Sequence, residues 1–160
     1  MEKITILCVD DQRDVLLSVA RDLQALSAWT TIEECESADE AEQIIDELDA
    51  EGRPLGLIVC DHIMPGITGV EFLTQVENTR HLRHVKKVLI TGQATHNDTI
   101  NAINQAKIDG YIEKPWDPEE LRGLCLRLLT EYLFDARKDI DSYRSVADPQ
   151  VLLSRMRGRE

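Results

Sequence analysis

The chain has 160 residues and a formal net charge of −12, from 30 acidic and 18 basic residues. This length suits one domain with a sizeable core and a small appendage. The acidic balance argues against a nucleic-acid surface, which needs clustered basic side chains. No stretch approaches the roughly 20 apolar residues of a membrane span, and the apolar run after Lys3 lacks a signal-peptide cleavage site. We therefore expect a cytoplasmic protein with no membrane or nucleic-acid contact.

Four cysteines occur in the chain, and none has the spacing of a metal-binding pair. Each falls in an apolar segment; they are Cys8, Cys35, Cys60 and Cys125. We expect buried, reduced thiols in the core.

The first third of the chain alternates strand patterns with helix patterns. The apolar run from Ile4 to Val9 predicts a strand buried on both faces. From Asp14 to Leu26, apolar residues recur at helical spacing. A weaker, β-branched strand is predicted over Thr30 to Cys35, and a capping-box pattern at Ser37 opens the next helix.

The same alternation continues to the end of the domain. Further strands are predicted over 55–60, 85–90 and 111–112. Helices are predicted over 70–76, around Ile100 and Ile103, and from Pro118 onward. Five strands, each followed by a helix, predict an α/β fold, a doubly wound five-stranded parallel sheet with helices on both faces.

Polar and charged side chains follow four of the predicted strands. They are Asp10-Asp11 after the first strand, Asp61 after the third, Thr91-Gly92 after the fourth and Glu113-Lys114-Pro115 after the fifth. Taken singly, each has an ordinary explanation, since turns favour an aspartate such as Asp61. However, the carboxyl ends of parallel strands meet at one sheet edge, where ligands bind. Three carboxylates, one hydroxyl and one ammonium are therefore predicted to meet there.

This set of side chains has a chemical use. Three neighbouring carboxylates repel one another and call for a cation, and all-oxygen ligands suit Mg²⁺. A phosphoryl group would complete the arrangement, with the metal and Lys114 neutralising its charge and Thr91 donating a hydrogen bond. Asp61 is then the natural nucleophile, which would form an aspartyl phosphate.

These stretches resemble the receiver domain of two-component response regulators. The matching segments are ILCVDD (6–11), LIVCDHIMPGITGVEFL (57–73), VLITGQA (88–94) and GYIEKPW (110–116). The resemblance covers about residues 3 to 130, with every motif in order. It implies a flavodoxin-like strand order of 2-1-3-4-5, Mg²⁺ as cofactor, and a histidine kinase or phosphotransfer protein as phosphodonor. It also implies a signalling module that catalyses only its own phosphorylation and dephosphorylation.

The resemblance assigns a metal site and an acceptor. Asp61 is implied as the phosphoacceptor and, with Asp11, as a direct Mg²⁺ ligand. Asp10 is expected to hold the metal through water, and the backbone carbonyl of Ile63 is the implied third protein ligand.

The resemblance also assigns the switch. Thr91 is the implied switch hydroxyl and Lys114 the ammonium that pairs with the phosphate. The Lys114–Pro115 bond is expected to be cis, which would aim the lysine into the site. Tyr111 fits the aromatic switch position, with a sheet-edge aromatic as the alternative. Receivers signal through the face of their fourth helix, fifth strand and fifth helix.

Three residues close to Asp61 and Thr91 in sequence carry further expectations. We expect His62 to be a surface residue rather than a proton shuttle. Ile63 presents an apolar side chain where the attacking water of hydrolysis would approach, which predicts slow self-dephosphorylation. Gln93, two residues beyond Thr91, is polar but uncharged.

The helix from Pro118 has a second apolar stripe at coiled-coil spacing. It consists of Leu126, Leu129, Leu133, Ala136, Ile140, Tyr143 and Ala147. It predicts an extended helix to about Arg144 that forms a homodimer or connects to something downstream, whereas the alternative is a helix folded back on its own domain. Asp148-Pro149 reads as a break that opens a short final helix. We expect a receiver domain over 1–130 and a helical extension over 131–160, coiled coil to about 147, with dimerisation through this helix or the fourth-to-fifth-helix face.

Three rival functions are weaker. A phosphohydrolase of the haloacid-dehalogenase type needs an acid two residues after the nucleophile, where this chain has Ile63. A nucleotide- or flavin-binding protein needs a glycine-rich loop after the first strand, where the chain has Asp10-Asp11. A phosphorylation-independent interaction or dimerisation module would be marked by loss of an acidic, Thr or Lys position, and none is lost.

Overall fold

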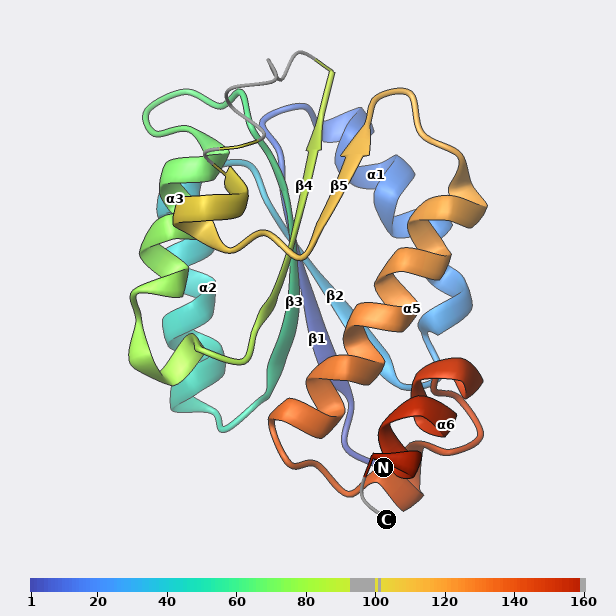
Figure 1. The fold of residues 1–160 in the computed structure, drawn as a ribbon. Helices are drawn as coiled ribbons and strands as arrows, with labels where there is room; N and C mark the ends of the chain where they lie inside the picture. The colour runs from blue at the N-terminus through green and yellow to red at the C-terminus, as the bar shows by residue number, and fades with distance from the viewer. Residues whose placement is uncertain (93–99, 101, 159–160) are drawn as a thin grey trace.

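A computed structural model of the chain describes residues 1–92, 100 and 102–158. Its centre is a five-stranded, all-parallel sheet in the order β2-β1-β3-β4-β5 (Figure 1). The strands are β1 (Ile4–Val9), β2 (Thr30–Cys35), β3 (Leu55–Asp61), β4 (Lys86–Thr91) and β5 (Gly110–Glu113). The predicted sheet is confirmed, and β1 and β2 have the predicted bounds.

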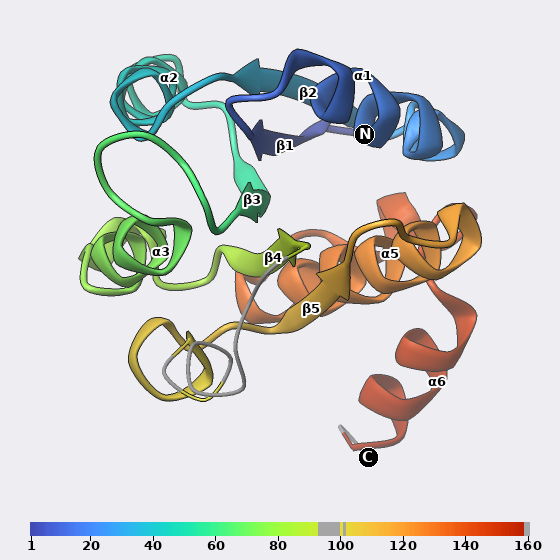
Figure 2. The same cartoon turned by 90° about the horizontal axis from the view of Figure 1, so that it is seen from above.

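Helices cover both faces of the sheet. The helices on the two faces are α1 (Arg13–Asp22), α2 (Ala38–Ala50), α3 (Gly69–Glu77) and α5 (Pro118–Asp135), and α6 (Pro149–Arg157) packs against α5. Shorter helical turns are η1 (Gln24–Leu26), η2 (Arg80–Leu82), η3 (Ala102–Ala106) and η4 (Ile140–Tyr143). In the view from above, α1 and α5 lie on one face, and α2, α3 and η3 lie on the other (Figure 2). Most residues of the predicted fourth helix lie outside the described part of the chain; η3 is its described end.

The alternation of side chains along the strands creates two cores. On β1, Ile4, Ile6 and Cys8 join the core under α1 and α5, whereas Leu7 and Val9 join the core under α2 and α3. All four cysteines are buried and free, as predicted. Among the described residues, no helix is long and apolar enough to cross a membrane.

The prediction of one helix running to about Arg144 is wrong. Helix α5 ends at Asp135, and Arg137 adopts a left-handed conformation with φ 56°. The backbone N–H of Lys138 donates to the carbonyl of Leu133 at 2.8 Å, and that of Arg137 donates to Phe134 at 3.1 Å. These two bonds form a Schellman motif, which ends a helix by reversing the chain direction.

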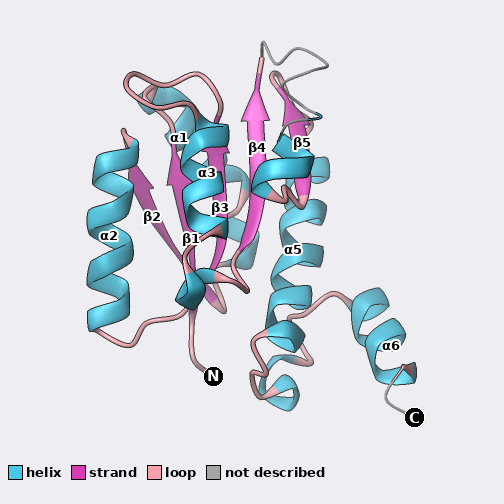
Figure 3. Ribbon diagram, turned by 60° about the vertical axis from the view of Figure 1, so that its left-hand side comes forward, coloured by secondary structure: helices cyan, strands magenta, loops and turns pink. Residues whose placement is uncertain are grey.

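Beyond this turn the chain folds back on its own domain, as the alternative interpretation held (Figure 3). Five of the seven stripe residues are buried in the core under α1 and α5, and the other two pack against it. The ring of Tyr143 meets that of Trp29 edge to face, with centroids 5.7 Å apart. The stripe is therefore occupied within the chain and is not free to form a coiled coil. The predicted break is confirmed, because Asp148 caps α6 by accepting from the N–H of Gln150 at 2.9 Å.

Candidate functional site

A cleft lies at the carboxyl ends of the strands. Its volume is about 330 Å³, and its lining residues are Asp11, Gln12, Asp61, Ile63, Thr91, Gly92 and Lys114. These residues come from the ends of β1, β3, β4 and β5, so the sheet order brings together segments that are far apart in sequence. The position agrees with the rule that open parallel sheets bind ligands at this edge.

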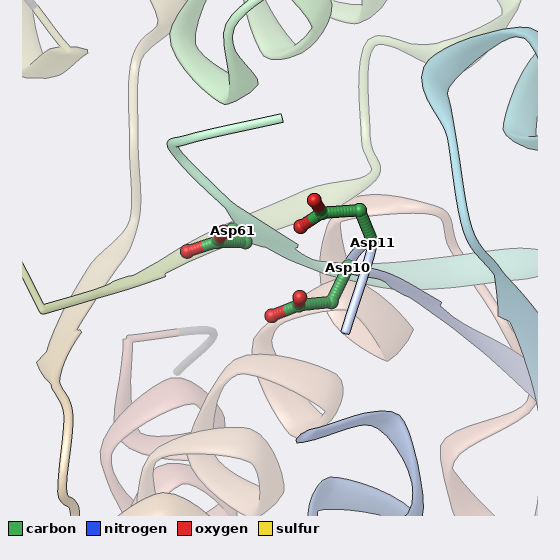
Figure 4. Close-up of side chains that lie close together, drawn as sticks. All are labelled: Asp10, Asp11 and Asp61. Atoms are coloured by element: carbon green, nitrogen blue, oxygen red, sulfur yellow. The ribbon is translucent and has the colours of Figure 1, made fainter. Parts of the chain in front are cut away.

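Three carboxylates meet at this edge. Asp10, Asp11 and Asp61 each offer an oxygen, and these oxygens all lie within 4.8 Å of one another. Figure 4 shows Asp10 and Asp11 side by side after β1, with Asp61 across from them at the end of β3. Asp10 and Asp61 are buried, whereas Asp11 is exposed. The backbone N–H of Gln12 donates to Asp10 Oδ1 at 2.8 Å, which fixes one oxygen of that carboxylate.

Lys114 brings a cation to the same place. Its Nζ lies 3.2 Å from Asp10 Oδ2 and 3.3 Å from Asp61 Oδ1. The backbone N–H of Lys114 donates to the carbonyl of Thr91 at 3.1 Å, which ties the end of β5 to the end of β4. The Lys114–Pro115 bond is cis, as predicted.

Burial dominates the electrostatics of the two inner carboxyls. It raises the pKa of both Asp10 and Asp61, and each acid has a neighbouring carboxylate that adds to the rise. The ammonium of Lys114 opposes the rise without cancelling it. For Lys114, burial lowers the pKa, but Asp10 and Asp61 outweigh burial and raise it above its usual value. Three carboxylates share the site with the ammonium of Lys114, so they carry more negative charge than that ammonium neutralises.

The donor set fits a hard divalent cation. Carboxylate oxygens are the ligands that Mg²⁺ prefers, and an excess of negative charge in a partly buried cleft favours a cation there. The side chain of Ile63 lines the same cleft and is 55% exposed. Its backbone carbonyl as a ligand stays a prediction.

The other residues predicted at or near the site can now be compared with the structure. Thr91 is fully buried at the end of β4, and Tyr111 is partly buried on β5, opposite Leu89. The expectation that His62 is a surface residue is wrong, because its side chain is only 7% exposed. Gln93 lies outside the described residues.

Gly69 has a structural role that the sequence reasoning missed. A Cβ at this position would lie 2.1 Å from the backbone oxygen of Asp61 and 2.9 Å from the Cα of His62. The N–H of Gly69 donates to the carbonyl of His62 at 2.8 Å. Glycine thus lets the first turn of α3 rest directly against the backbone that carries Asp61. The capping box at Thr68 marks where the helix begins, but it does not show how closely the helix approaches the backbone of Asp61.

A five-stranded parallel sheet with an acidic triad and a lysine at its carboxyl edge defines a class of signalling domain. The family model described as the response regulator receiver domain matches residues 6–125. This chain therefore belongs to the response regulator receiver domain family, which is a family of signalling modules rather than of classical enzymes.

Individual relatives are consistent with this membership. The chain is 34% identical over 120 residues to the hydrogenase transcriptional regulatory protein HoxA of Cupriavidus necator, a match that covers 75% of this chain and 23% of HoxA. It is 28% identical to the chemotaxis protein CheY of Pseudomonas aeruginosa, covering 73% of this chain and 89% of CheY. The chain thus spans less than a quarter of the length of the HoxA relative.

Solved structures show the same architecture. The crystal structure of a CheY-like response regulator receiver domain protein from Methanospirillum hungatei JF-1 matches with a TM-score of 0.71 and 27% identity. The match covers 84% of this chain and 99% of that chain.

Proposed function

We propose that this chain is a phosphorylatable receiver that takes a phosphoryl group onto Asp61 from a histidine kinase or a phosphotransfer protein. The observation that carries the proposal is the meeting of three carboxylates and one ammonium at a single edge of the sheet, from the ends of three strands. Neighbouring carboxylates repel one another, and burying them costs free energy. The stability of the fold therefore does not explain why these acids face one another.

Asp10, Asp11 and Asp61 would hold the Mg²⁺ ion, together with the backbone carbonyl of Ile63. When bound, the ion neutralises charge on the carboxylates and on the transferring phosphoryl group. Because Asp11 is exposed while the other two acids are buried, the cleft admits a cation from its solvent side.

Asp61 supplies the nucleophile. A carboxylate oxygen of Asp61 forms a bond to phosphorus as the P–N bond of the donor phosphohistidine breaks, and the leaving imidazole keeps that electron pair and takes up a proton. Lys114 already lies 3.3 Å from Asp61 Oδ1, where its ammonium can pair with a phosphoryl oxygen. The hydroxyl of Thr91 would donate to another oxygen.

Thr91 and Tyr111 would link the site to the surface of the domain. Recruitment of the Thr91 hydroxyl to the phosphoryl group would shift the end of β4, and Tyr111 on the neighbouring β5 would move inward. The face formed by η3, β5 and α5 would then change its population of two conformations and control a partner or a downstream output. Any homodimer would use this face.

The proposal is tested by intact mass after incubation with acetyl phosphate and Mg²⁺. One added phosphoryl group is expected for the wild type, and none for Asp61→Asn or in the presence of a chelator. A wild-type chain that stays unmodified with acetyl phosphate and with phosphoramidate would contradict the proposal. It would instead favour an interaction module that works without phosphorylation.

A further inference from the structure

A partly buried hydrogen bond connects α1 to the loop that follows Lys114. The indole Nε1 of Trp116 donates to Asp22 Oδ2 at 2.7 Å, across 94 residues of sequence. The Asp22 side chain, at the end of α1, is 8% exposed. Trp116 packs against the core under α1 and α5. Figure 2 shows α1 and α5 on the same face of the sheet, with the loop from β5 running to the start of α5.

Core stability alone does not explain an aspartate at this place. A buried carboxylate costs free energy unless it has close partners. Asp22 also pairs with Arg21, whose Nε lies 4.0 Å from Asp22 Oδ1 and whose side chain is 78% exposed, so that ion pair is weak. The indole N–H is the close partner, and a hydrogen bond to a charged acceptor is stronger and more directional than a neutral one.

The loop itself is short and is held at both ends. At its start, the N–H of Lys114 donates to the carbonyl of Thr91 at 3.1 Å. At its end, Asp117 caps α5 by accepting from the N–H of Glu119 at 3.0 Å. The bond from Trp116 to Asp22 lies between these two points and ties the loop to a third element.

That third element is also connected to the acidic pair. Helix α1 begins at Arg13, two residues after Asp11, and ends at Asp22. The start of α1 therefore follows directly on Asp10-Asp11, and its last residue, Asp22, holds the loop that follows Lys114. A helix of this length is rigid, so it fixes the loop relative to the acids.

We propose that Asp22 is a positioning residue for phosphoryl transfer, acting through Trp116 to place Lys114 between Asp10 and Asp61. The lysine side chain has many rotamers, and its ammonium reaches both carboxylates only when its backbone is held in place. Displacement by about 1 Å can cost a large factor in rate. This inference rests on the proposed function.

The test compares three variants with the wild type in phosphorylation by acetyl phosphate and Mg²⁺. Asp22→Ala is expected to lower the saturating rate about tenfold, whereas Asp22→Asn keeps an acceptor oxygen and is expected to recover at least half of the wild-type rate. Val19→Ala removes buried apolar atoms from the same helix without touching the bond. It should lose stability but keep the wild-type rate.

A second readout needs no phosphorylation. In the metal-free protein, Asp22→Ala should shift the combined emission of Trp29 and Trp116 toward that of a solvated indole, whereas Val19→Ala should not. Trp116→Phe removes the N–H and keeps a ring, and it should lower the rate as Asp22→Ala does. If Asp22→Ala does not fold, the rate of Trp116→Phe alone tests the positioning role.

The outcomes separate the two proposals. If the wild type is phosphorylated and both Asp22→Ala and Trp116→Phe react at the wild-type rate, the positioning role is overturned and the proposed function stands. If Val19→Ala slows as much as Asp22→Ala, the bond contributes only stability and the inference is again overturned. A wild type that takes no phosphoryl group overturns both.

Discussion

The carboxyl group of Asp61 is subject to opposing influences on its pKa. Burial and the neighbouring Asp10 raise the pKa, and the ammonium of Lys114 lowers it, with a net rise above the ordinary value. A raised folded-state pKa means that the folded chain binds the proton more tightly than the unfolded chain does. The ionised form of Asp61 therefore destabilises the metal-free protein at neutral pH.

Asp61→Asn is accordingly expected to raise the free energy of unfolding in the presence of a chelator at about pH 7, because the amide carries no charge to bury. The advantage should shrink as the pH falls from the raised pKa toward 3.8 and disappear below it. Urea denaturation of both proteins across this range measures the difference. A variant less stable than the wild type at neutral pH would contradict the electrostatic account.

Gly69 offers a steric prediction. The Cβ of Gly69→Ala would lie only 2.1 Å from the backbone oxygen of Asp61, so α3 must move away to avoid the clash. We expect a loss of about 1–3 kcal/mol in the free energy of unfolding, typical of overpacking. The matched control is Gly123→Ala, since a Cβ there meets nothing within 4 Å. That control sits inside α5 and should gain about 0.5–1 kcal/mol. Equal effects at the two positions would refute the steric argument.

Ile63 leads to a kinetic prediction. Its exposed apolar side chain lines the cleft, at the place where water must approach a phosphorylated Asp61. Ile63→Asn should therefore speed the loss of the phosphoryl group, because an amide can orient water and an alkyl chain cannot. Decay of the phosphorylated form, followed by mass after removal of the donor, measures this rate. An unchanged or slower decay in the variant would count against it.

Which residues meet at the site could be predicted from the sequence, because strand ends in a parallel sheet share an edge. Asp10 and Asp61 lie at the ends of long apolar runs that are easily recognised, and Lys114 follows the short strand that contains Tyr111 and Ile112. Contacts such as those of Gly69 and Asp22 were not predictable in this way. They depend on how closely a helix approaches a neighbouring backbone or loop, and no periodic pattern records that distance.

At the scale of elements, the C-terminal segment shows the limit of pattern reading. A 3-4 apolar spacing predicts a buried stripe, and the stripe is buried. The spacing cannot say whether the covering surface belongs to a partner or to the same chain. The helix end was also hidden, because Arg137 occupies the left-handed position where glycine is usual.

The packing of this segment predicts a large effect at Tyr143. Its side chain is buried against Trp29, and its hydroxyl donates to the backbone carbonyl of Glu2. Tyr143→Ala should cost about 3–5 kcal/mol of unfolding free energy, as for other buried aromatic residues. Leu153→Ala on α6 is the control; its side chain is 56% exposed, and the change should stay within about 0.5 kcal/mol. A small loss at Tyr143 in chemical denaturation would show that the segment is not part of the core.

At the scale of the whole molecule, the intramolecular use of the stripe predicts the oligomeric state. The unphosphorylated chain should sediment as a monomer of 18.2 kDa at micromolar concentration, because the residues expected to form a coiled coil are already covered. Analytical ultracentrifugation measures the mass. A stable dimer that is lost on Tyr143→Ala would indicate that the segment exchanges its contacts for those of a second copy.

The whole chain is larger than the matched family region, which ends at residue 125. Arg155 on α6 bonds to both Glu131 and Asp135 of α5, and Lys86 at the start of β4 pairs with Asp135 at 2.7 Å. These contacts connect the extension to the strand that ends in Thr91. We propose a boundary between the receiver and its extension near residue 130. We also propose that the two parts move together when the chain is phosphorylated.

The most direct test of this account identifies the residue that carries the phosphoryl group. After reaction with acetyl phosphate and Mg²⁺, borohydride reduction converts an aspartyl phosphate to homoserine, and peptide mass spectrometry locates the change. Homoserine is expected at position 61 alone. Modification at Asp10 or Asp11 with Asp61 unmodified would contradict it, since the acids assigned to the metal would then be the acceptors.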